Sequence, residues 1–174
     1  MYIAQAAYAF RISGQPVCCV DFGHGHINRT LKITTDTGHM YVLQQINKYV
    51  FKDPVKVMAN ASAVTNYLLD RCSDPRAALH FIPTLQGQYY HRDQEGQFWR
   101  MYDFVDGFCL DTPESAADFY ESALAFGTFQ ELLSDFPAHN LIRARTQFAL
   151  VADIQKKWNE MHRIVAEVAN QVRS

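Results

Sequence analysis

A glycine-rich turn between two apolar stretches is the part of this sequence best suited to hold an anion. It reads Gly23-His24-Gly25-His26-Ile27-Asn28-Arg29-Thr30, with strand-like residues 17–20 before it and 30–34 after it. Glycine has no Cβ, so two glycines one residue apart let the backbone turn tightly and direct successive N–H groups at one anion. The turn therefore predicts either a phosphate-binding hairpin or an ordinary hairpin turn. The dinucleotide fingerprint is excluded, because no third glycine follows at its spacing and the continuation is typical of a strand.

Four polar side chains of this turn could add to its chemistry. Asn28 and Thr30 either donate hydrogen bonds near a phosphate or simply stabilise the turn. His24 and His26 have a His-x-His spacing, but no further ligands cluster nearby, so no metal site is predicted. The same imidazoles could donate a hydrogen bond to a phosphate or an acceptor, or face solvent as ordinary turn histidines.

Composition predicts a soluble globular chain. Of 174 residues, 48% are hydrophobic and 20% are charged, and no apolar run is long enough to span a membrane. The first residues show neither a basic opening nor an apolar signal region, so we expect a cytoplasmic location. A net charge of −2 without a basic stripe predicts no nucleic-acid partner. The four cysteines lack metal-type spacing and are expected to be reduced thiols in the interior.

The first hundred residues have the alternation and turn signals of an antiparallel sheet. The pattern of residues 3–12 fits a short helix and a strand equally well. A helix over 55–69 is predicted to lie on the sheet through Val57, Ala61, Val64 and Leu68, with Asp53 as its N-cap. Strands are predicted at 17–20, 30–34, 40–46 and 79–85, and Pro83 suggests an edge or an irregularity in the last of them. A hairpin is predicted to pair 88–91 with 98–105 across 93–96.

Beyond Asp106-Gly107 the periodicity becomes helical. One helix is predicted to begin at Thr112-Pro113-Glu114 and to bury Phe119, Ala123, Phe126 and Leu133. A last helix is predicted over about 141–172, with an apolar stripe that needs a partner, so either self-association or further chain is implied. We therefore expect one domain over 1–106 and a second, helical segment over 107–174.

Several segments in this order resemble one family. They are Gly-His-Gly-His-Ile-Asn at 23–28, Tyr-Val-Leu-Gln-Gln-Ile-Asn at 41–47, Val-Phe-Lys-Asp-Pro at 50–54, Val-Thr-Asn-Tyr-Leu at 64–68, Trp-Arg-Met-Tyr at 99–102 and Ala-Phe-Gly-Thr-Phe-Gln at 125–130. The combination resembles the amino-terminal lobe of N-acetylhexosamine 1-kinases, members of the aminoglycoside phosphotransferase and choline kinase superfamily. The resemblance covers about residues 8–137.

The resemblance implies an α+β, protein-kinase-like amino-terminal lobe. Its antiparallel sheet would have five to seven strands and a crossing helix, followed by a hinge at 102–107 and two helices. The loop at 23–30 would cover the phosphates of ATP, which is held with Mg²⁺, and the hinge backbone would pair with adenine. The nucleotide-binding residues implied in this way are Gly23, His24, Gly25, His26, Ile27, Asn28, Thr30, Gln44, Tyr102, Asp103, Phe104 and Val105.

Two positions depart from the kinase pattern. Gln44 stands where such lobes carry a lysine that pairs with the phosphates, and Ala59 stands near the position of the glutamate that holds this lysine. Glutamine can donate a hydrogen bond but brings no charge. We therefore expect weaker phosphate binding unless Mg²⁺ or Arg29 compensates.

The third departure is an absence. The catalytic segment of the family reads approximately His-x-Asp-x-x-x-x-Asn and belongs to a second lobe, and nothing like it occurs here; His139-Asn140 lacks the aspartate. The chain is therefore expected to be an excised domain, a truncated product or a relative without catalysis. It would be inactive alone, and the sugar acceptor would bind only with a second lobe. The alternative is a non-catalytic binding module that dimerises through its last helix.

Overall fold

The computed structural model describes residues 4–23, 25, 27–107, 112, 115–137, 139 and 141–142. His24, His26 and Cys109 fall outside the described residues, as does the predicted last helix apart from Leu141 and Ile142. The roles expected of these histidines, and of dimerisation through the last helix, therefore stay predictions.

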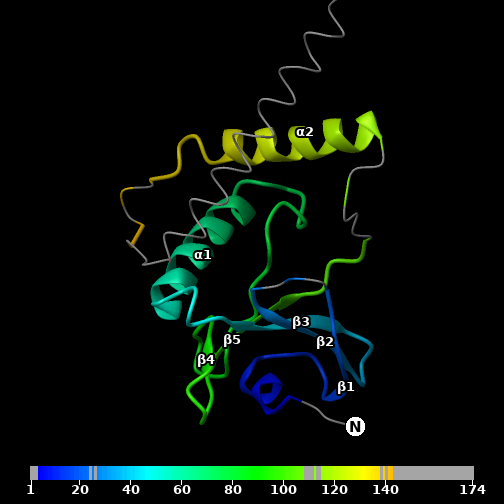
Figure 1. Cartoon of the computed structure of the whole chain (residues 1–174), viewed down its shortest axis with the longest axis vertical. Helices are drawn as coiled ribbons and strands as arrows, with labels where there is room; N and C mark the ends of the chain where they lie inside the picture. Colours follow the sequence, from blue (N-terminus) through cyan, green and yellow to red (C-terminus); the bar gives the residue numbers. More distant parts are fainter. Residues whose placement is uncertain are drawn as a thin grey trace, which may run out of the picture.

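A five-stranded antiparallel sheet is the framework of the chain, with the strand order β1-β2-β3-β5-β4 (Figure 1). Its strands are β1 Pro16–Asp21, β2 Arg29–Thr35, β3 Met40–Ile46, β4 His91–Arg92 and β5 Phe98–Asp103. The predicted α+β fold and the meander of the first three strands are thus confirmed. Antiparallel pairing sets Gln44 opposite Thr30 on one side and opposite Arg100 on the other.

Strand alternation gives the sheet two unlike faces. In β2, Leu31 and Ile33 are buried, whereas Thr30 and Lys32 are half-buried and lie on the opposite face. The two faces therefore have different partners, and only one of them carries polar side chains in its middle.

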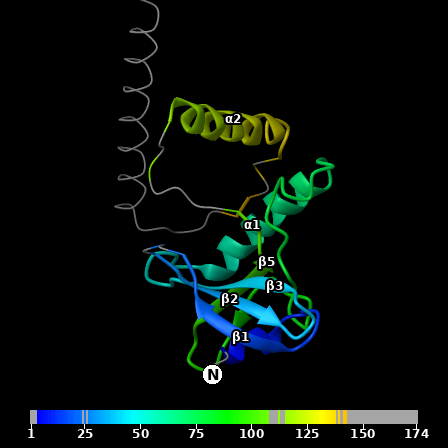
Figure 2. The ribbon, with the colours of Figure 1, turned by 90° about the vertical axis from the view of Figure 1, so that its right-hand side faces the viewer.

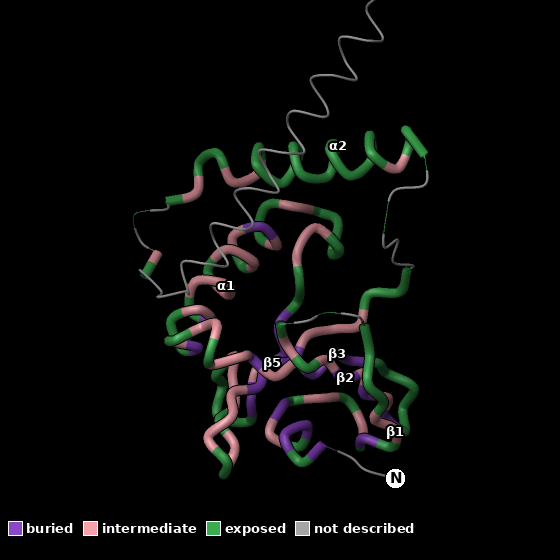
Figure 3. The backbone as a smooth tube through the Cα atoms, in the orientation of Figure 1, coloured by how far each residue is buried: buried purple, intermediate pink, exposed green. Residues whose placement is uncertain are grey.

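The apolar face is closed by the first described residues. A short 3₁₀ helix, η1 (Gln5–Ala9), settles the alternative that the sequence leaves open over 3–12. Ala7 and Phe10 are buried, and this segment packs against sheet residues that include Leu31, Leu43 and Met101. In Figure 3 the purple, buried part of the tube is concentrated here and along the middle strands.

Helix α1 (Pro54–Leu69) lies on the other side of the sheet, as Figures 1 and 2 show. The predicted N-cap is confirmed, since the Asp53 carboxylate accepts a hydrogen bond from Lys56 N at 3.2 Å. Met58 is the helix residue buried against Ile46 and Phe81. The predicted apolar face is confirmed in part, since Leu68 is buried and Ala61 packs against the same cluster, whereas Met58 takes the place expected of Val57.

The predicted strand over 79–85 does not form, but the irregularity expected at Pro83 is confirmed. Only two isolated bridges occur there, Phe10 with Thr84 and Phe81 with Tyr102. Pro83 has no N–H, so a regular ladder cannot run through it. The hairpin at the end of the sheet is confirmed, although β4 contains only two residues.

Helix α2 (Ala116–Leu132) starts later than predicted. Ser115 is its N-cap and forms a reciprocal capping box with Asp118, which outweighs the helix-start signal at 112–114. The expectation of a buried face on this helix is also wrong, because no α2 residue is buried and Phe119 is 47% exposed. None of the helices in the described part of the chain is long and apolar enough to cross a membrane.

Candidate functional site

The glycine turn is an open hairpin loop between β1 and β2. Phe22 N donates to Thr30 O at 2.9 Å, so the ladder continues one residue past β1 before the loop opens. Gly23 has φ +81°, a conformation that residues with a Cβ rarely adopt, and nothing lies within 4 Å of where a Cβ would stand on Gly23 or Gly25. Gly23 and Gly25 are therefore open to solvent.

The far end of the loop is tied to the end of β3. Asn28 Oδ1 accepts from Asn47 N at 2.9 Å, and Asn47 Nδ2 donates to Ile27 O at 3.0 Å. Arg29 forms an exposed pair with Asp21 at 3.5 Å. These contacts place Asn28 in the role of a loop anchor, and they leave Arg29 on the face opposite Thr30 and Gln44.

A polar line crosses the middle of the sheet on the α1 face. Arg100 donates to Gln44 Oε1 twice, from Nε at 2.9 Å and from Nη2 at 2.6 Å. Gln44 Nε2 then donates to Thr30 Oγ1 at 2.9 Å. The structure thus joins two predicted site residues, Thr30 and Gln44, and adds an arginine from the neighbouring strand.

The hinge meets the base of the loop through aromatic contacts. The Phe104 ring lies edge to face with Phe22 at 5.4 Å between centroids. Lys32 Nζ lies 4.0 Å from the centroid of the same ring. Tyr102 lies on this face too, and burial raises the pKa of its hydroxyl while the charge of Arg100 opposes that rise. Loop, hinge and the two cations therefore share one face of the sheet.

Only part of the hinge backbone forms hydrogen bonds with other described residues. Asp103 N donates to His80 O at 3.2 Å, and Phe104 N donates to Met40 O at 3.1 Å. Across the described residues, no hydrogen bond to the backbone of Val105, Asp106 or Gly107 is found. The Asp103 side chain lies on the face opposite that of Tyr102, and its carboxylate bonds His80 Nδ1 at 2.6 Å. The hinge can thus offer free N–H and C=O groups to a flat ring.

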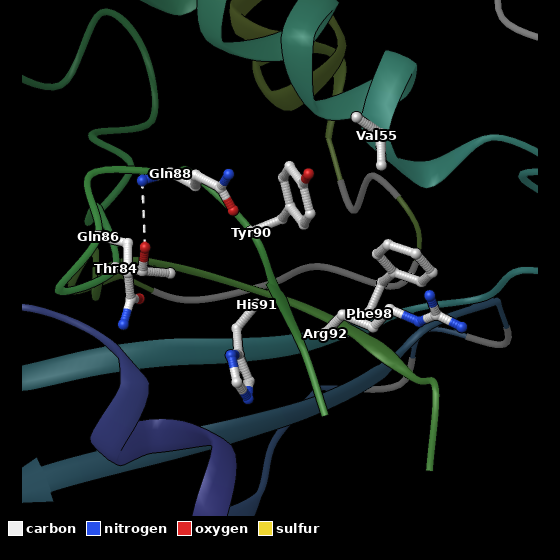
Figure 4. A pocket seen from close by; sticks show the side chains of 8 residues that line it. All are labelled: Val55, Thr84, Gln86, Gln88, Tyr90, His91, Arg92 and Phe98. Carbon is white, nitrogen blue, oxygen red and sulfur yellow. Dashed lines mark hydrogen bonds between the residues drawn. The ribbon is translucent and has the colours of Figure 1, made fainter. Parts of the chain in front are cut away.

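Two hollows of the described surface include no hinge residue. A hollow of about 430 Å³ lies at the β4 edge and is lined by Val55, Thr84, Gln86, Gln88, Tyr90, His91, Arg92 and Phe98 (Figure 4). A second, of about 240 Å³, touches the loop at Ile27 and Arg29. The candidate site is the polar line and the open hinge, because neither hollow includes Gln44, Arg100 or a hinge residue.

Two residues of this face, Lys32 and Arg100, were not among those predicted. Lys32 could have been found, because it follows Thr30 by two residues on a predicted strand and so shares its face. Arg100 could not, because its position opposite Gln44 depends on a pairing register between segments 56 residues apart.

Comparison with known proteins supports the fold. No protein-family model matches the sequence. The chain is similar to the crystal structure of an aminoglycoside phosphotransferase from Alicyclobacillus acidocaldarius subsp. acidocaldarius DSM 446, with a TM-score of 0.58 and 12% sequence identity. The match covers 94% of this chain and 43% of that one, so the chain spans less than half the length of that protein. At this identity the likeness shows the fold alone, an α+β lobe of the protein-kinase-like type.

Proposed function

We propose that this chain is the nucleotide-binding lobe of an ATP-dependent small-molecule phosphotransferase. The observation that carries the proposal is that the glycine loop and a hinge with free backbone groups meet on one sheet face, joined through Phe22 and Phe104. A purine needs a flat apolar slot edged by backbone donors and acceptors, and phosphates need a glycine-rich backbone. The resemblance of segments 23–28, 41–47 and 50–54 to sugar kinases supports the same reading.

In this proposal ATP binds with Mg²⁺ and the acceptor is the anomeric hydroxyl of an amino sugar. The catalytic carboxylate and the acceptor pocket would come from a second lobe, so the chain alone binds nucleotide but transfers no phosphate. The choice of an N-acetylhexosamine rests on the sequence resemblance. Residues 1–106 would form the nucleotide lobe, and 107–174 would begin the connection to the second lobe.

Nucleotide binding is tested by calorimetric titration of the 174-residue chain with ATP at about 5 mM Mg²⁺. We expect saturable one-to-one binding with a Kd between about 10 µM and 1 mM, weak because the position of the kinase lysine holds a neutral amide. GTP and inorganic triphosphate serve as matched ligands that keep the phosphates but change or remove adenine. Absence of saturation at 5 mM ATP would overturn the proposal.

Catalytic inactivity is tested separately. The chain is incubated with radiolabelled ATP and N-acetylglucosamine, and sugar phosphate is measured. We expect none above background. Measurable turnover would show that the carboxylate chemistry is present in this chain and that the assignment of catalysis to a second lobe is wrong.

A second candidate function is a non-catalytic assembly module. Exposed apolar side chains on α2, including Tyr120 at 66% and Leu124 at 51%, favour it, as does the uncharged Gln44. The two functions differ in the titration: an assembly module would associate with itself and ignore ATP, whereas the nucleotide lobe binds ATP whatever its association state.

A further inference from the structure

The hydrogen bonds between Arg100, Gln44 and Thr30 all run in one direction. Arginine carries donors and no acceptor, so the atom of Gln44 that faces Arg100 must be the carbonyl oxygen. The amide NH₂ of Gln44 then faces Thr30, whose Oγ1 accepts from it. A threonine hydroxyl that accepts in this way keeps its own proton, and no acceptor for that proton is found among the described residues.

Arg100 has an unusual setting for a cation. It is half-buried, one N–H faces the Met58 sulfur at 3.9 Å, and the guanidinium lies 5.8 Å from the Phe81 ring centroid. No carboxylate of the described chain lies within ion-pair distance of it. Burial lowers the pKa of this arginine from its ordinary value, yet arginine stays charged at neutral pH. Burying a charge without a counter-ion is costly, and such charges are a feature of binding sites.

The chain of donors runs toward the glycine loop. Arg100 is on β5, Gln44 on the adjacent β3 and Thr30 near the start of β2, two residues after Asn28. Each donor in the series polarises the next, so the charge of Arg100 strengthens the final hydroxyl as a donor.

We propose that Arg100, Gln44 and Thr30 form a donor relay that presents the Thr30 hydroxyl to a phosphate of the bound nucleotide. The relay rests on the proposed nucleotide function and takes the place of the lysine and glutamate pair of kinase-type lobes. Arg100 is a positioning residue in it: it fixes the orientation of the Gln44 amide and does not itself reach the ligand. The relay recognises an anionic oxygen of the phosphates and does not contact the base.

The affinity for adenosine distinguishes this role from a purely structural one. A relay that reads phosphate affects ATP and leaves adenosine unchanged, whereas a disturbed sheet would weaken both. Charge-assisted hydrogen bonds contribute enough that Arg100→Met should weaken ATP binding about 10- to 50-fold. Arg100→Lys keeps a charged donor without an acceptor and should recover part of this loss.

The test compares Kd values for ATP and adenosine in Arg100→Met, Arg100→Lys, Thr30→Val and the double variant Arg100→Met/Thr30→Val. Thr30→Val conserves shape and removes only the hydroxyl, so it remains informative if Arg100→Met does not fold. Arg76→Met, the same change at an exposed arginine outside the sheet, is the control and should bind both ligands as the original chain does. We expect the double variant to lose little more than the worse single variant, because both changes break one relay.

Three results decide the matter. A selective loss of ATP binding in Thr30→Val and Arg100→Met, without additivity, supports the relay. Unchanged ATP-to-adenosine ratios in both variants overturn the relay and leave the proposed nucleotide function standing. If the original chain binds neither ligand, the proposed function fails and the relay fails with it.

Discussion

The two glycines of the loop differ in backbone conformation although both are open to solvent. Gly23 has φ +81° and Gly25 does not have a positive φ, while neither would crowd a Cβ. Gly23→Ala should therefore destabilise the chain by about 1 kcal/mol, and Gly25→Ala should change stability by less than about 0.5 kcal/mol. Urea unfolding of both variants measures the difference. Equal costs would contradict the importance of the Gly23 backbone conformation.

Asp93 shows a carboxylate used to close a turn. It accepts from Glu95 N at 3.0 Å, from Gln97 N at 2.8 Å and from Trp99 Nε1 at 2.7 Å. Burial raises the pKa of this carboxyl, but the hydrogen bonds from Trp99, Gln97 and Glu95 outweigh burial, and the net pKa is lowered. The folded state thus favours the charged form of Asp93.

The sign of this shift gives a pH prediction. A carboxyl whose folded pKa is lowered contributes stability that is fully present above its unfolded pKa, near 4, and is lost as the pH falls through the folded pKa. Asp93→Asn should cost about 1–3 kcal/mol at pH 7, and the cost should shrink below about pH 4. Urea unfolding at pH 7, 5, 4 and 3 measures it, with Asp135→Asn as an exposed control. A cost that stays constant from pH 7 to pH 3 would refute the assigned role of the charge.

The sequence predicts which residues are important better than it predicts which neighbours their side chains contact. Residue type and spacing indicated the loop glycines and the Asp53 cap, and the family resemblance pointed to Gln44. Two contacts depend on which strand positions face each other. They are the hydrogen bond between Asn28 and Asn47 and the one between Gln44 and Arg100. Pairing register is set by tertiary packing, so these contacts could not be read from local pattern.

Helix α2 is an element formed by its own sequence more than by packing. Ser115 Oγ accepts from Asp118 N at 3.2 Å, and Ser115 N donates to the Asp118 carboxylate at 2.8 Å. No α2 residue is buried. We therefore expect α2 to open locally, without unfolding the sheet.

Ser115→Ala removes this cap and should lower amide protection in the first turn of α2 about fivefold, which corresponds to about 1 kcal/mol. Native-state hydrogen exchange measures it, and protection in β2 and β3 should not change. Ser122→Ala, the same substitution in the exposed middle of the helix, should leave protection unchanged or raise it, because alanine is the better helix former. Loss of protection in the sheet after Ser115→Ala would show that α2 unfolds together with it.

The alternation of β2 and the helical spacing of α1 predicted these two elements correctly. The strands β1 and β3 lack clear alternation and were predicted from their apolar residues and the turns beside them. The segment 79–85 has apolar residues typical of a strand, yet Pro83 and its neighbours support only isolated bridges. For α2, an apolar stripe predicted a helix correctly but a buried face wrongly, since burial depends on a neighbour and not on the helix itself.

Most of the described elements are arranged around one sheet. The segment with η1 covers the apolar face, α1 covers part of the other, and the polar line from Arg100 to Thr30 lies on the α1 face (Figure 1). Because Met58 of α1 touches both Phe81 and Arg100, the helix that stabilises this face also supports its charged residue. The fold and the candidate site are therefore built from the same contacts.

The apolar surface of α2 makes a prediction for the molecule in solution. Phe119 is 47%, Tyr120 66% and Phe129 41% exposed. Exposed aromatic residues gathered on one element favour association through that element. We expect sedimentation velocity to show concentration-dependent dimers above about 50 µM, little affected by salt because apolar contacts are not screened.

Phe119→Ser combined with Phe129→Ser should shift this equilibrium toward monomer at least tenfold, because both substitutions remove apolar area from the association surface. Glu121→Gln on the same helix changes charge without removing apolar area, so it is the control and should associate as the original chain does. Strict monomers at every concentration would remove the support for an assembly role. Dimers unaffected by the double substitution would place the association surface elsewhere. ATP added to the same samples separates the two candidate functions, since a nucleotide lobe binds ATP in monomer and dimer alike.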